Sequence, residues 1–335
     1  MNTIPDQGKA PASVPDKERT GVSVTVTCTA RLHLGFFDLA GGPGRRFGSI
    51  GLALDQPVTR LVARRADATR VSGPEAERVG RYLALMDQRF GWDWRHDIAV
   101  QATMPAHAGL GSGTQLALAV ATAVRRLHAK ADEPRADAAL LERGARSGIG
   151  IGLFSQGGLV VDGGQGARDG PPPLLLRMAV PEAWRVLLVM DRGCEGLSGT
   201  RERAAFAALA PMPASVSGAI CRLVLMQALP AVAEQDLAAF GSAITAIQGH
   251  VGDYFAPVQG GRFASSAVSA ALHLLAEEGA AGIGQSSWGP TGFAFAADDD
   301  QARRLANTVE ARLAAKRLDL LICRVLNRGA SVEVA

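Results

Sequence analysis

A glycine-rich loop between a predicted strand and a predicted helix constrains the fold of this chain more than any other segment. The loop reads Pro105-Ala-His-Ala-Gly-Leu-Gly-Ser-Gly-Thr-Gln115. Before it, residues 98–103 alternate between apolar and polar side chains, which is typical of a half-buried strand. After it, apolar residues recur at helical spacing as far as Leu127, so a helix is expected to begin near Ser112 or Thr114.

This arrangement predicts an anion-binding site. The first backbone N–H groups of a helix have no partner within the helix, and glycine lets a phosphate approach the backbone closely. A phosphate or pyrophosphate is the expected ligand, and the candidate binding residues are Gly109, Leu110, Gly111, Ser112, Gly113 and Thr114. The alternative is an ordinary glycine turn before a helix. The loop is neither a Walker A motif, because no Lys-Ser/Thr pair follows it, nor a G-x-G-x-x-G dinucleotide motif.

The order of the remaining elements indicates an α+β fold with two domains. Residues 1–21 contain prolines among polar residues and are expected to form a disordered tail, followed by an N-terminal domain over 22–180 and a C-terminal domain over 181–335. Strands are expected near 22–28, 58–63, 98–103, 157–162, 185–190, 292–297 and 320–325, and helices near 75–89, 112–127, 134–146, 201–209, 215–229, 234–248, 264–278 and 299–316. The glycine-rich segment 41–51 is interpreted as a connection between strands, and the segment 147–152 as a break in the helical pattern.

Composition excludes several classes of function. A chain of 335 residues with 47% hydrophobic and 20% charged residues is typical of a globular protein with a large core. The apolar runs are far short of a membrane span and the N-terminus lacks a signal pattern, so a cytoplasmic protein without membrane contact is expected. A net charge of +3, with no dense Lys/Arg run among aromatics, argues against nucleic-acid binding. The four cysteines are scattered, which favours structural thiols over a zinc site.

Three further residues are candidates for catalysis. Arg31 and His33 stand two residues apart where an alternating strand ends, so their side chains are expected to point to the same side. An arginine beside a histidine can bind an anion and manage a proton, although a surface pair satisfied by nearby acids is an equal alternative. His107 lies inside the loop and could reach a bound phosphate or its metal; the alternative is a solvent-exposed loop histidine.

Two further polar segments supply candidate binding residues. Residues 191–202 combine carboxylates, arginines and glycines after a predicted strand, and Arg192 or Arg201 could clamp a carboxylate or phosphate with two hydrogen bonds. Arg192 is also a candidate catalytic residue. As an alternative, residues 198–202 simply cap the next helix. The turn at 284–292 contributes Gln285 and Ser286 as candidate substrate-binding residues.

The loop resembles the second motif of the GHMP kinase superfamily, written P-x-x-x-G-L-G-S-S-A, with departures at Gly113 and Thr114. This resemblance implies a two-domain GHMP-kinase-like fold with mixed and antiparallel sheets and packed helices. It also implies that the loop wraps phosphates and that the C-terminal glycine motif, here 284–292, packs against it. In many GHMP kinases an S-G-(V/I)-D segment supplies the aspartate that activates the acceptor hydroxyl. Here Ser147-Gly-Ile is followed by Gly150, which cannot take a proton, so kinase activity is disfavoured.

Five segments together resemble the β-ribofuranosylaminobenzene 5'-phosphate synthase family, and the resemblance extends from about residue 22 to the C-terminus. They are residues 30–39, 47–57, 109–115, 146–150 and 284–290. The resemblance implies a glycosyltransferase that joins phosphoribosyl pyrophosphate to 4-hydroxybenzoate or 4-aminobenzoate, releasing carbon dioxide and pyrophosphate, early in tetrahydromethanopterin biosynthesis. It also implies Mg²⁺ on the pyrophosphate, with no metal ligand assigned, and a homodimer.

On this interpretation, pyrophosphate lies against 109–114, with Arg31 and His33 near the sugar phosphate or the benzoate. Two alternatives stay open, an ATP-dependent small-molecule kinase and a non-catalytic ligand sensor, because one fold can host several functions.

Overall fold

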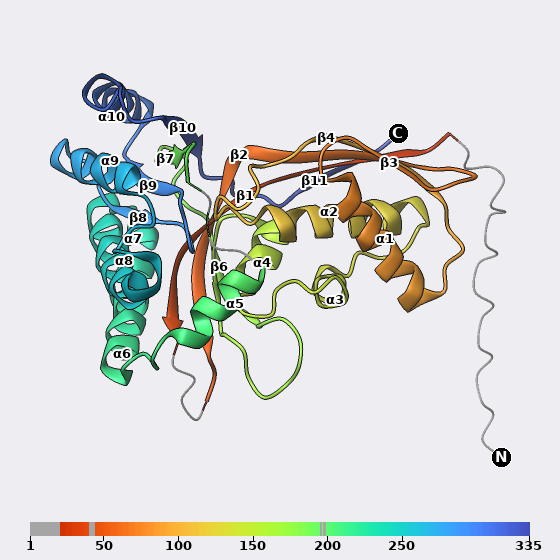
Figure 1. Cartoon of the computed structure of the whole chain (residues 1–335), viewed down its shortest axis with the longest axis horizontal. Coiled ribbons are helices and arrows are strands. Elements are labelled where there is room, and N and C mark those ends of the chain that lie inside the picture. Colours follow the sequence, from red (N-terminus) through yellow and green to blue (C-terminus); the bar gives the residue numbers. More distant parts are fainter. Residues whose placement is uncertain (1–20, 40–43, 195, 197–198) are drawn as a thin grey trace, which may run out of the picture.

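The structure is a computed structural model that describes residues 21–39, 44–194, 196 and 199–335, so the predicted tail lies outside the described residues except for Gly21. Its described residues form two sheets (Figure 1). In the first, the strand order is β11-β1-β2-β4-β3, and β5 pairs with β2 and with β6. The strands of this sheet are β1 (Ser23–Asp38), β2 (Phe47–Arg65), β3 (Arg70–Ser72), β4 (His96–Ala102), β5 (Leu159–Asp162), β6 (Leu174–Met178) and β11 (Ser331–Val334).

Strands β1 and β2 form a long antiparallel hairpin. Alternate residues of β1 are buried, as the sequence pattern predicts. The prediction for β2 was wrong, because this strand begins at Phe47 and not near residue 58. Its first half, with Ile50 and Leu52 fully buried, pairs with β1 although it lies in the segment interpreted as a connection. The register of β1 shifts between Thr29 and Arg31 and again between His33 and Gly35, and such bulges re-aim side chains.

Four helices cover one face of the first sheet: α1 (Ala76–Phe90), α2 (Ser112–Leu127), α3 (Pro134–Leu140) and α4 (Ile149–Gln156). Helix α2 begins at Ser112, as expected, and packs on β1 and β2. Helix α3 is shorter than expected. The predicted break at 147–152 was wrong, since Ile149 and Leu153 bury the apolar face of α4. At Gly152 a Cβ atom would lie 2.7 Å from Leu174, so glycine lets α4 approach β6 closely; this packing outweighs the poor helix propensity of glycine.

The second sheet is antiparallel and lies between two helical layers. Its order is β10-β7-β9-β8, from β7 (Arg185–Asp191), β8 (Ile283–Gln285), β9 (Gly292–Ala296) and β10 (Leu318–Arg324). Leu187 and Val189 pack with α9 (Ser266–Glu277) and α10 (Asp299–Arg312), whereas Val186 and Leu188 belong to the core that includes α8 (Leu237–Gln259). Neighbouring residues of one strand therefore serve opposite layers.

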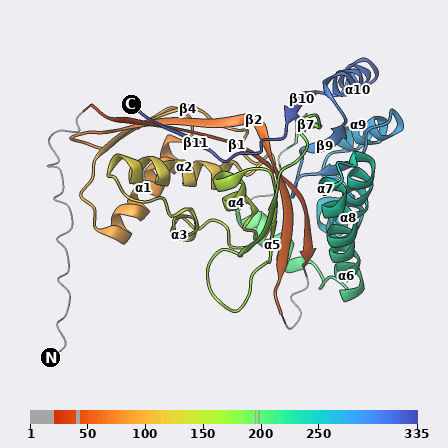
Figure 2. The ribbon, with the colours of Figure 1, turned by 180° about the vertical axis from the view of Figure 1, so that it is seen from behind.

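The two sheets share one core. Helix α8 contacts both β8 and β1, and Figure 1 and Figure 2 show the second sheet and its helices at one end of the long β1–β2 hairpin. Strands up to Met178 belong to the first sheet and those from Arg185 to Arg324 to the second, but β11 returns to pair with β1. The α+β class with mixed and antiparallel sheets is confirmed, β3 and β4 being parallel. The domain boundary near residue 181 stays a prediction.

One helical stretch corrects the expectation that apolar segments are far too short for a membrane. Helix α6 (Ala214–Leu223), the π-helix η2 (Val224–Ala228) and α7 (Leu229–Ala233) run on as 20 residues whose length and mean hydropathy of 1.6 suffice to cross one. Buried helices of globular proteins meet the same criterion, and this stretch packs against α8. Its outer side carries the exposed Leu225 and Met226. The remaining helix, α5 (Gly199–Ala208), precedes it.

Candidate active site

A cleft of about 630 Å³ opens where the glycine loop, the end of β1 and the segment after α3 meet. Its volume is in the range of small-molecule sites. The lining residues are Arg31, His33, Phe36, Arg78, Arg81, His107, Gly109, Gly111, Ser112, Gly113, Thr114, Glu142, Arg143, Gly144, Ala145, Arg146, Ser147, Ser287, Trp288 and Gly289. The predicted loop, Arg31, His33 and His107 are thus brought together.

The glycine loop is held in place by two other segments. Gly111 is the N-cap of α2 at a φ of 80°, and its carbonyl accepts hydrogen bonds from the N–H groups of Thr114 and Gln115. At Gly109, with a φ of 76°, a Cβ atom would lie 2.3 Å from the carbonyl oxygen of Ser286. Glycine is required here by the close approach of backbone as well as by the turn. The helix N-terminus faces the cleft through residues 112–114.

Arg31 and Ser286 are the groups that hold this loop. The backbone N–H of Arg31 donates to the carbonyl of Leu110 at 3.0 Å, and its Nη1 donates to the carbonyl of Gly109 at 3.1 Å. The hydroxyl of Ser286 donates to the same Gly109 carbonyl at 2.8 Å and accepts the backbone N–H of His33 at 3.0 Å. The expected packing of the 284–292 turn against the loop is observed.

His33 is buried and neutral. Only 2% of its surface is exposed, so the alternative of an exposed surface pair is wrong for this residue. Burial, and secondarily the positive charge of Arg31, lowers the pKa of His33 well below its usual value. Its Nε2 atom has no hydrogen-bond partner among the described residues. An unpaired buried polar atom is destabilising, which points to a ligand as its partner.

Four arginines that the sequence reasoning missed line the cleft: Arg78, Arg81, Arg143 and Arg146. Arg78 and Arg81 lie one turn apart on α1, where each pairs with a glutamate, and Arg143 and Arg146 come just before the Ser147 motif. Their spacing was a usable signal, because residues three apart on a helix share a face. Glu142, with a φ of 57°, is the acidic residue among the described lining positions. The lining is therefore strongly cationic.

Of these four arginines, Arg143 lies nearest to Gly113 of the loop. A Cβ atom at Gly113 would lie 3.6 Å from its Nη1, and its Nη2 donates to the Tyr82 hydroxyl at 2.9 Å. Among the described residues it forms no ion pair, and its buried Nε has no hydrogen-bond partner. A guanidinium without a counter-ion beside a helix N-terminus is suited to an anion.

Two of the three departures from the GHMP motifs, Thr114 and Gly150, are neighbours in space. A Cβ atom at Gly150 would lie 3.1 Å from Cγ2 of Thr114, and the side-chain amide of Gln115 donates to the Gly150 carbonyl at 2.9 Å. Thr114 thus packs against residue 150, for which the resemblance to GHMP kinases implied an aspartate. A side chain at residue 150 would require Thr114 to move.

A buried carboxylate, also missed from the sequence, fixes the turn before α4. Asp162 is fully buried and accepts hydrogen bonds from the Ser147 hydroxyl at 3.1 Å, Gly148 N–H at 2.9 Å and Gly164 N–H at 2.8 Å. Burial raises the pKa of Asp162, and the hydrogen bonds partly oppose this. Ser147, which lines the cleft, is positioned in this way.

Other predicted site residues lie elsewhere or serve the protein itself. Arg192 is exposed, pairs with Asp319 and does not line the cleft, so its predicted catalytic position is not supported by the geometry. Arg201 belongs to the first turn of α5, but its side chain lies outside the described part. Leu110 is buried in the core and contributes its carbonyl. Gln285 lines a smaller cavity behind His33, and Ser286 is fully buried; the side chains of both bond to backbone groups.

Comparison with known proteins establishes the fold. Residues 77–158 match the model of the GHMP kinases N terminal domain and residues 228–315 that of GHMP kinases C terminal. A homoserine kinase from Cytophaga hutchinsonii superposes with a TM-score of 0.66 at 16% identity, covering 97% of this chain and all of that one. Mevalonate diphosphate decarboxylase from Staphylococcus aureus gives 0.65 at 14% identity, covering 93% and 98%. The predicted GHMP-kinase-like fold is confirmed.

Three relatives with sequences more similar to this chain than those structures share the name Beta-ribofuranosylphenol 5'-phosphate synthase. The protein of that name from Archaeoglobus fulgidus is 32% identical over 319 residues, which cover 91% of this chain and 98% of the relative. That from Methanothermobacter thermautotrophicus is 29% identical over 331 residues, covering 92% and 98%. Similarity of this extent covers about nine-tenths of the chain. The chain therefore belongs to the beta-ribofuranosylphenol 5'-phosphate synthase family of the GHMP kinase superfamily.

Proposed function

We propose that the protein is a decarboxylating glycosyltransferase that joins phosphoribosyl pyrophosphate to a para-substituted benzoate and releases carbon dioxide and pyrophosphate. The observation that carries the proposal is a cationic cleft with a helix N-terminus for phosphate, beside which Gly150 stands at the position where the resemblance to GHMP kinases implies an aspartate base. The name shared by the relatives supports the same reaction class.

The reaction balances without a base at residue 150. The bond between the ribose anomeric carbon and pyrophosphate breaks, and pyrophosphate leaves with the electron pair. The ring carbon that bears the carboxylate forms the new bond to the anomeric carbon. The bond from that ring carbon to the carboxylate then breaks, its electrons restore aromaticity, and carbon dioxide departs. No acceptor hydroxyl loses a proton in this sequence, so a glycine at 150 is compatible with it.

In this proposal the protein mainly stabilises the departing anion. The N–H groups at the start of α2 and the guanidinium of Arg143 would bind the pyrophosphate as its charge develops. Arg31 has a positioning role, because its hydrogen bonds hold the loop carbonyls of Gly109 and Leu110.

The cleft also has donor atoms that suit Mg²⁺. Among the described residues no cluster of three or more His, Cys, Asp or Glu side chains could hold a metal alone. The lining does offer the Ser112 and Thr114 hydroxyls and the Glu142 carboxylate. Mg²⁺ commonly uses one or two carboxylates together with substrate phosphates, so this set fits, and these three residues would hold it. When bound, Mg²⁺ would neutralise charge on the leaving pyrophosphate.

The relatives' name favours the hydroxy acceptor. A ribofuranosylphenol product corresponds to 4-hydroxybenzoate, whereas the sequence alone leaves 4-aminobenzoate equally open. By the same resemblance, the proposal places the protein early in tetrahydromethanopterin biosynthesis and as a homodimer; a cytoplasmic location stays the prediction made from the sequence pattern. Light scattering on the purified protein tests the dimer.

One assay tests the reaction. The protein is incubated with Mg²⁺, phosphoribosyl pyrophosphate and carboxyl-labelled 4-hydroxybenzoate or 4-aminobenzoate, and labelled carbon dioxide is measured. Release that depends on phosphoribosyl pyrophosphate is the expected result. Formation of ADP from ATP and an alcohol, with no carbon dioxide released, would instead identify a kinase, and binding without turnover a ligand sensor.

A further inference from the structure

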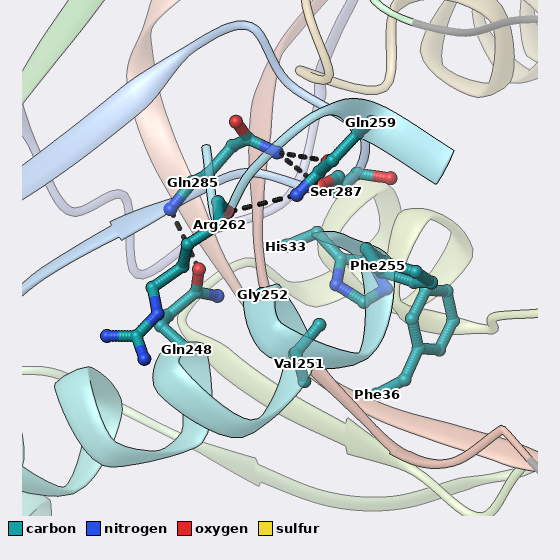
Figure 3. A pocket seen from close by; sticks show the side chains of 11 residues that line it. His33, Phe36, Gln248, Val251, Gly252, Phe255, Gln259, Arg262, Gln285 and Ser287 are labelled. Atoms are coloured by element: carbon teal, nitrogen blue, oxygen red, sulfur yellow. Dashed lines mark hydrogen bonds between the residues drawn. The ribbon is translucent and has the colours of Figure 1, made fainter. Parts of the chain in front are cut away.

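A small cavity, here called the inner pocket, lies behind the cleft and shares three lining residues with it. His33, Phe36 and Ser287 line both spaces. Figure 3 shows the His33 ring beside Phe36 and Phe255, with α8 forming one wall of the pocket. The inner pocket measures about 10 Å³, which is room for a single water-sized group.

Most polar side chains around the inner pocket are already paired within the protein. The amide of Gln248 donates to the Leu34 carbonyl at 2.7 Å, and its oxygen accepts the N–H of Gln285. The amide of Gln259 donates to the Arg262 carbonyl at 2.9 Å, and the oxygen of Gln285 accepts the N–H of Ala264. Nε2 of His33 is the buried atom left without a partner in the described structure.

The proposed reaction dictates how an aromatic acid would enter this region. The carbon that carries the carboxylate must meet the ribose, whose pyrophosphate lies against the glycine loop. The carboxylate edge of the ring therefore faces the loop, and the para substituent points away from it. Phe36 and Trp288 supply aromatic surface along the cleft between these ends, and ring contacts of this kind stabilise aromatic ligands.

We propose that the inner pocket receives the para substituent of the aromatic acid and that Nε2 of His33 is its hydrogen-bond partner. This assignment rests on the proposed function for the orientation of the ring. A hydroxyl or an amino group fits a space for one heavy atom, whereas a methoxy group does not. Because His33 is neutral, its Nε2 can accept a hydrogen bond from either group. The pocket selects for size and polarity at the para position.

Equilibrium dialysis of the purified protein against labelled acids tests the pocket without turnover. The wild-type protein is expected to bind 4-hydroxybenzoate at least about tenfold more tightly than 4-methoxybenzoate, since a single methyl overpacks the pocket. Val251→Ala, which enlarges the pocket at its α8 wall, is expected to reduce the preference for 4-hydroxybenzoate over 4-methoxybenzoate about fivefold or more. Val309→Ala, at a buried valine of α10 distant from both cavities, is the matched control and should leave the preference unchanged.

His33→Phe keeps a ring and removes the nitrogen. The expected result is about tenfold weaker binding of 4-hydroxybenzoate with unchanged binding of unsubstituted benzoate. The KM for phosphoribosyl pyrophosphate should change less than about threefold.

Failures of the two proposals are distinguishable. If the wild-type protein releases no carbon dioxide but shows the expected preference and its relaxation in Val251→Ala, the reaction is wrong and the pocket assignment stands. If it releases carbon dioxide but binds the hydroxy and methoxy acids equally, or if Val251→Ala leaves their ratio unaltered, the pocket assignment is overturned.

Discussion

At the scale of single residues, Arg143 is the side chain on which substrate binding is expected to depend most. Its guanidinium lies beside Gly113 of the loop and forms no ion pair among the described residues. A hydrogen bond to a charged group contributes about 1.5–3 kcal/mol, so Arg143→Gln should lower kcat/KM for phosphoribosyl pyrophosphate roughly 10- to 150-fold. Initial rates at varied phosphoribosyl pyrophosphate measure this.

Arg312→Gln is the control for that variant, because Arg312 lies on α10 in an exposed ion pair with Glu278. Its kinetics should match those of the wild-type protein. Equal kcat/KM for Arg143→Gln and the wild-type protein would remove Arg143 from the pyrophosphate site.

Thr114 and Gly150 predict an interaction that stability measurements can detect. In a helix, Gly→Ala favours folding by about 1 kcal/mol, but at residue 150 the new methyl would press on Thr114. Gly150→Ala should therefore be neutral or destabilising in the wild-type protein and stabilising in Thr114→Ala. Urea unfolding of the four variants of this cycle should give a coupling above about 0.5 kcal/mol. Additive effects would show that the two side-chain positions do not compete for space.

At the scale of elements, the start of β4 and the end of α2 meet through two histidines. Nε2 of His96 lies 3.0 Å from Nε2 of His128, and the Trp94 ring stacks on His128 with centroids 3.5 Å apart. Burial, with added effects of Arg65 and Arg95, lowers the pKa of His96 from 6.5 to about 4. This junction therefore favours a neutral His96.

The lowered pKa of His96 makes the stability of the protein depend on pH in a defined direction. Between about pH 6.5 and 4 the unfolded chain binds a proton at residue 96 that the folded protein does not, so the free energy of unfolding falls as pH falls. One such group contributes at most about 1.4 kcal/mol per pH unit. His96→Gln should flatten this slope in thermal or urea unfolding between pH 7 and 4.5. His273→Gln, at an exposed position on α9, should leave this slope unchanged. If the wild-type protein and His96→Gln show parallel stability-versus-pH profiles, the assignment to His96 is contradicted.

Elements with strong local signals could be predicted from the sequence, and those stabilised by distant contacts could not. The glycine loop and the start of α2 follow from glycines, a cap and helical spacing that lie within a few residues of each other. Helix α4 contains Gly150 and Gly152 and has Gly148 as its N-cap, and it forms because its apolar face packs on the first sheet. The early half of β2 was missed in part for the same reason: β1, its hairpin partner, is close in sequence, but its other partner, β5, comes from far along the chain.

At the scale of the whole molecule, the site combines residues whose association no local pattern reveals. Arg31 and His33 were found because they follow a clear strand, whereas Arg78, Arg143 and Trp288 come from three separate segments. The inner pocket forms only where β1, α8 and β8 come together, because each of them contributes lining residues. Conversely, Arg192 and Gln285 were singled out for their residue type and their place in a loop or turn, and the fold gives each a partner within the protein. The chemistry that a residue type can perform can be predicted from the sequence, but the neighbours that its side chain has depend on the fold.

The hydrogen bond from Ser286 to the Gly109 carbonyl joins residues 177 positions apart and has a consequence for biosynthesis. When a ribosome has translated the first half of the chain, every residue of the loop exists, but the serine that holds it does not. A nascent chain at that stage carries the anion-binding sequence without its final support. The site is therefore completed late in synthesis, after the second half of the chain has folded onto the first.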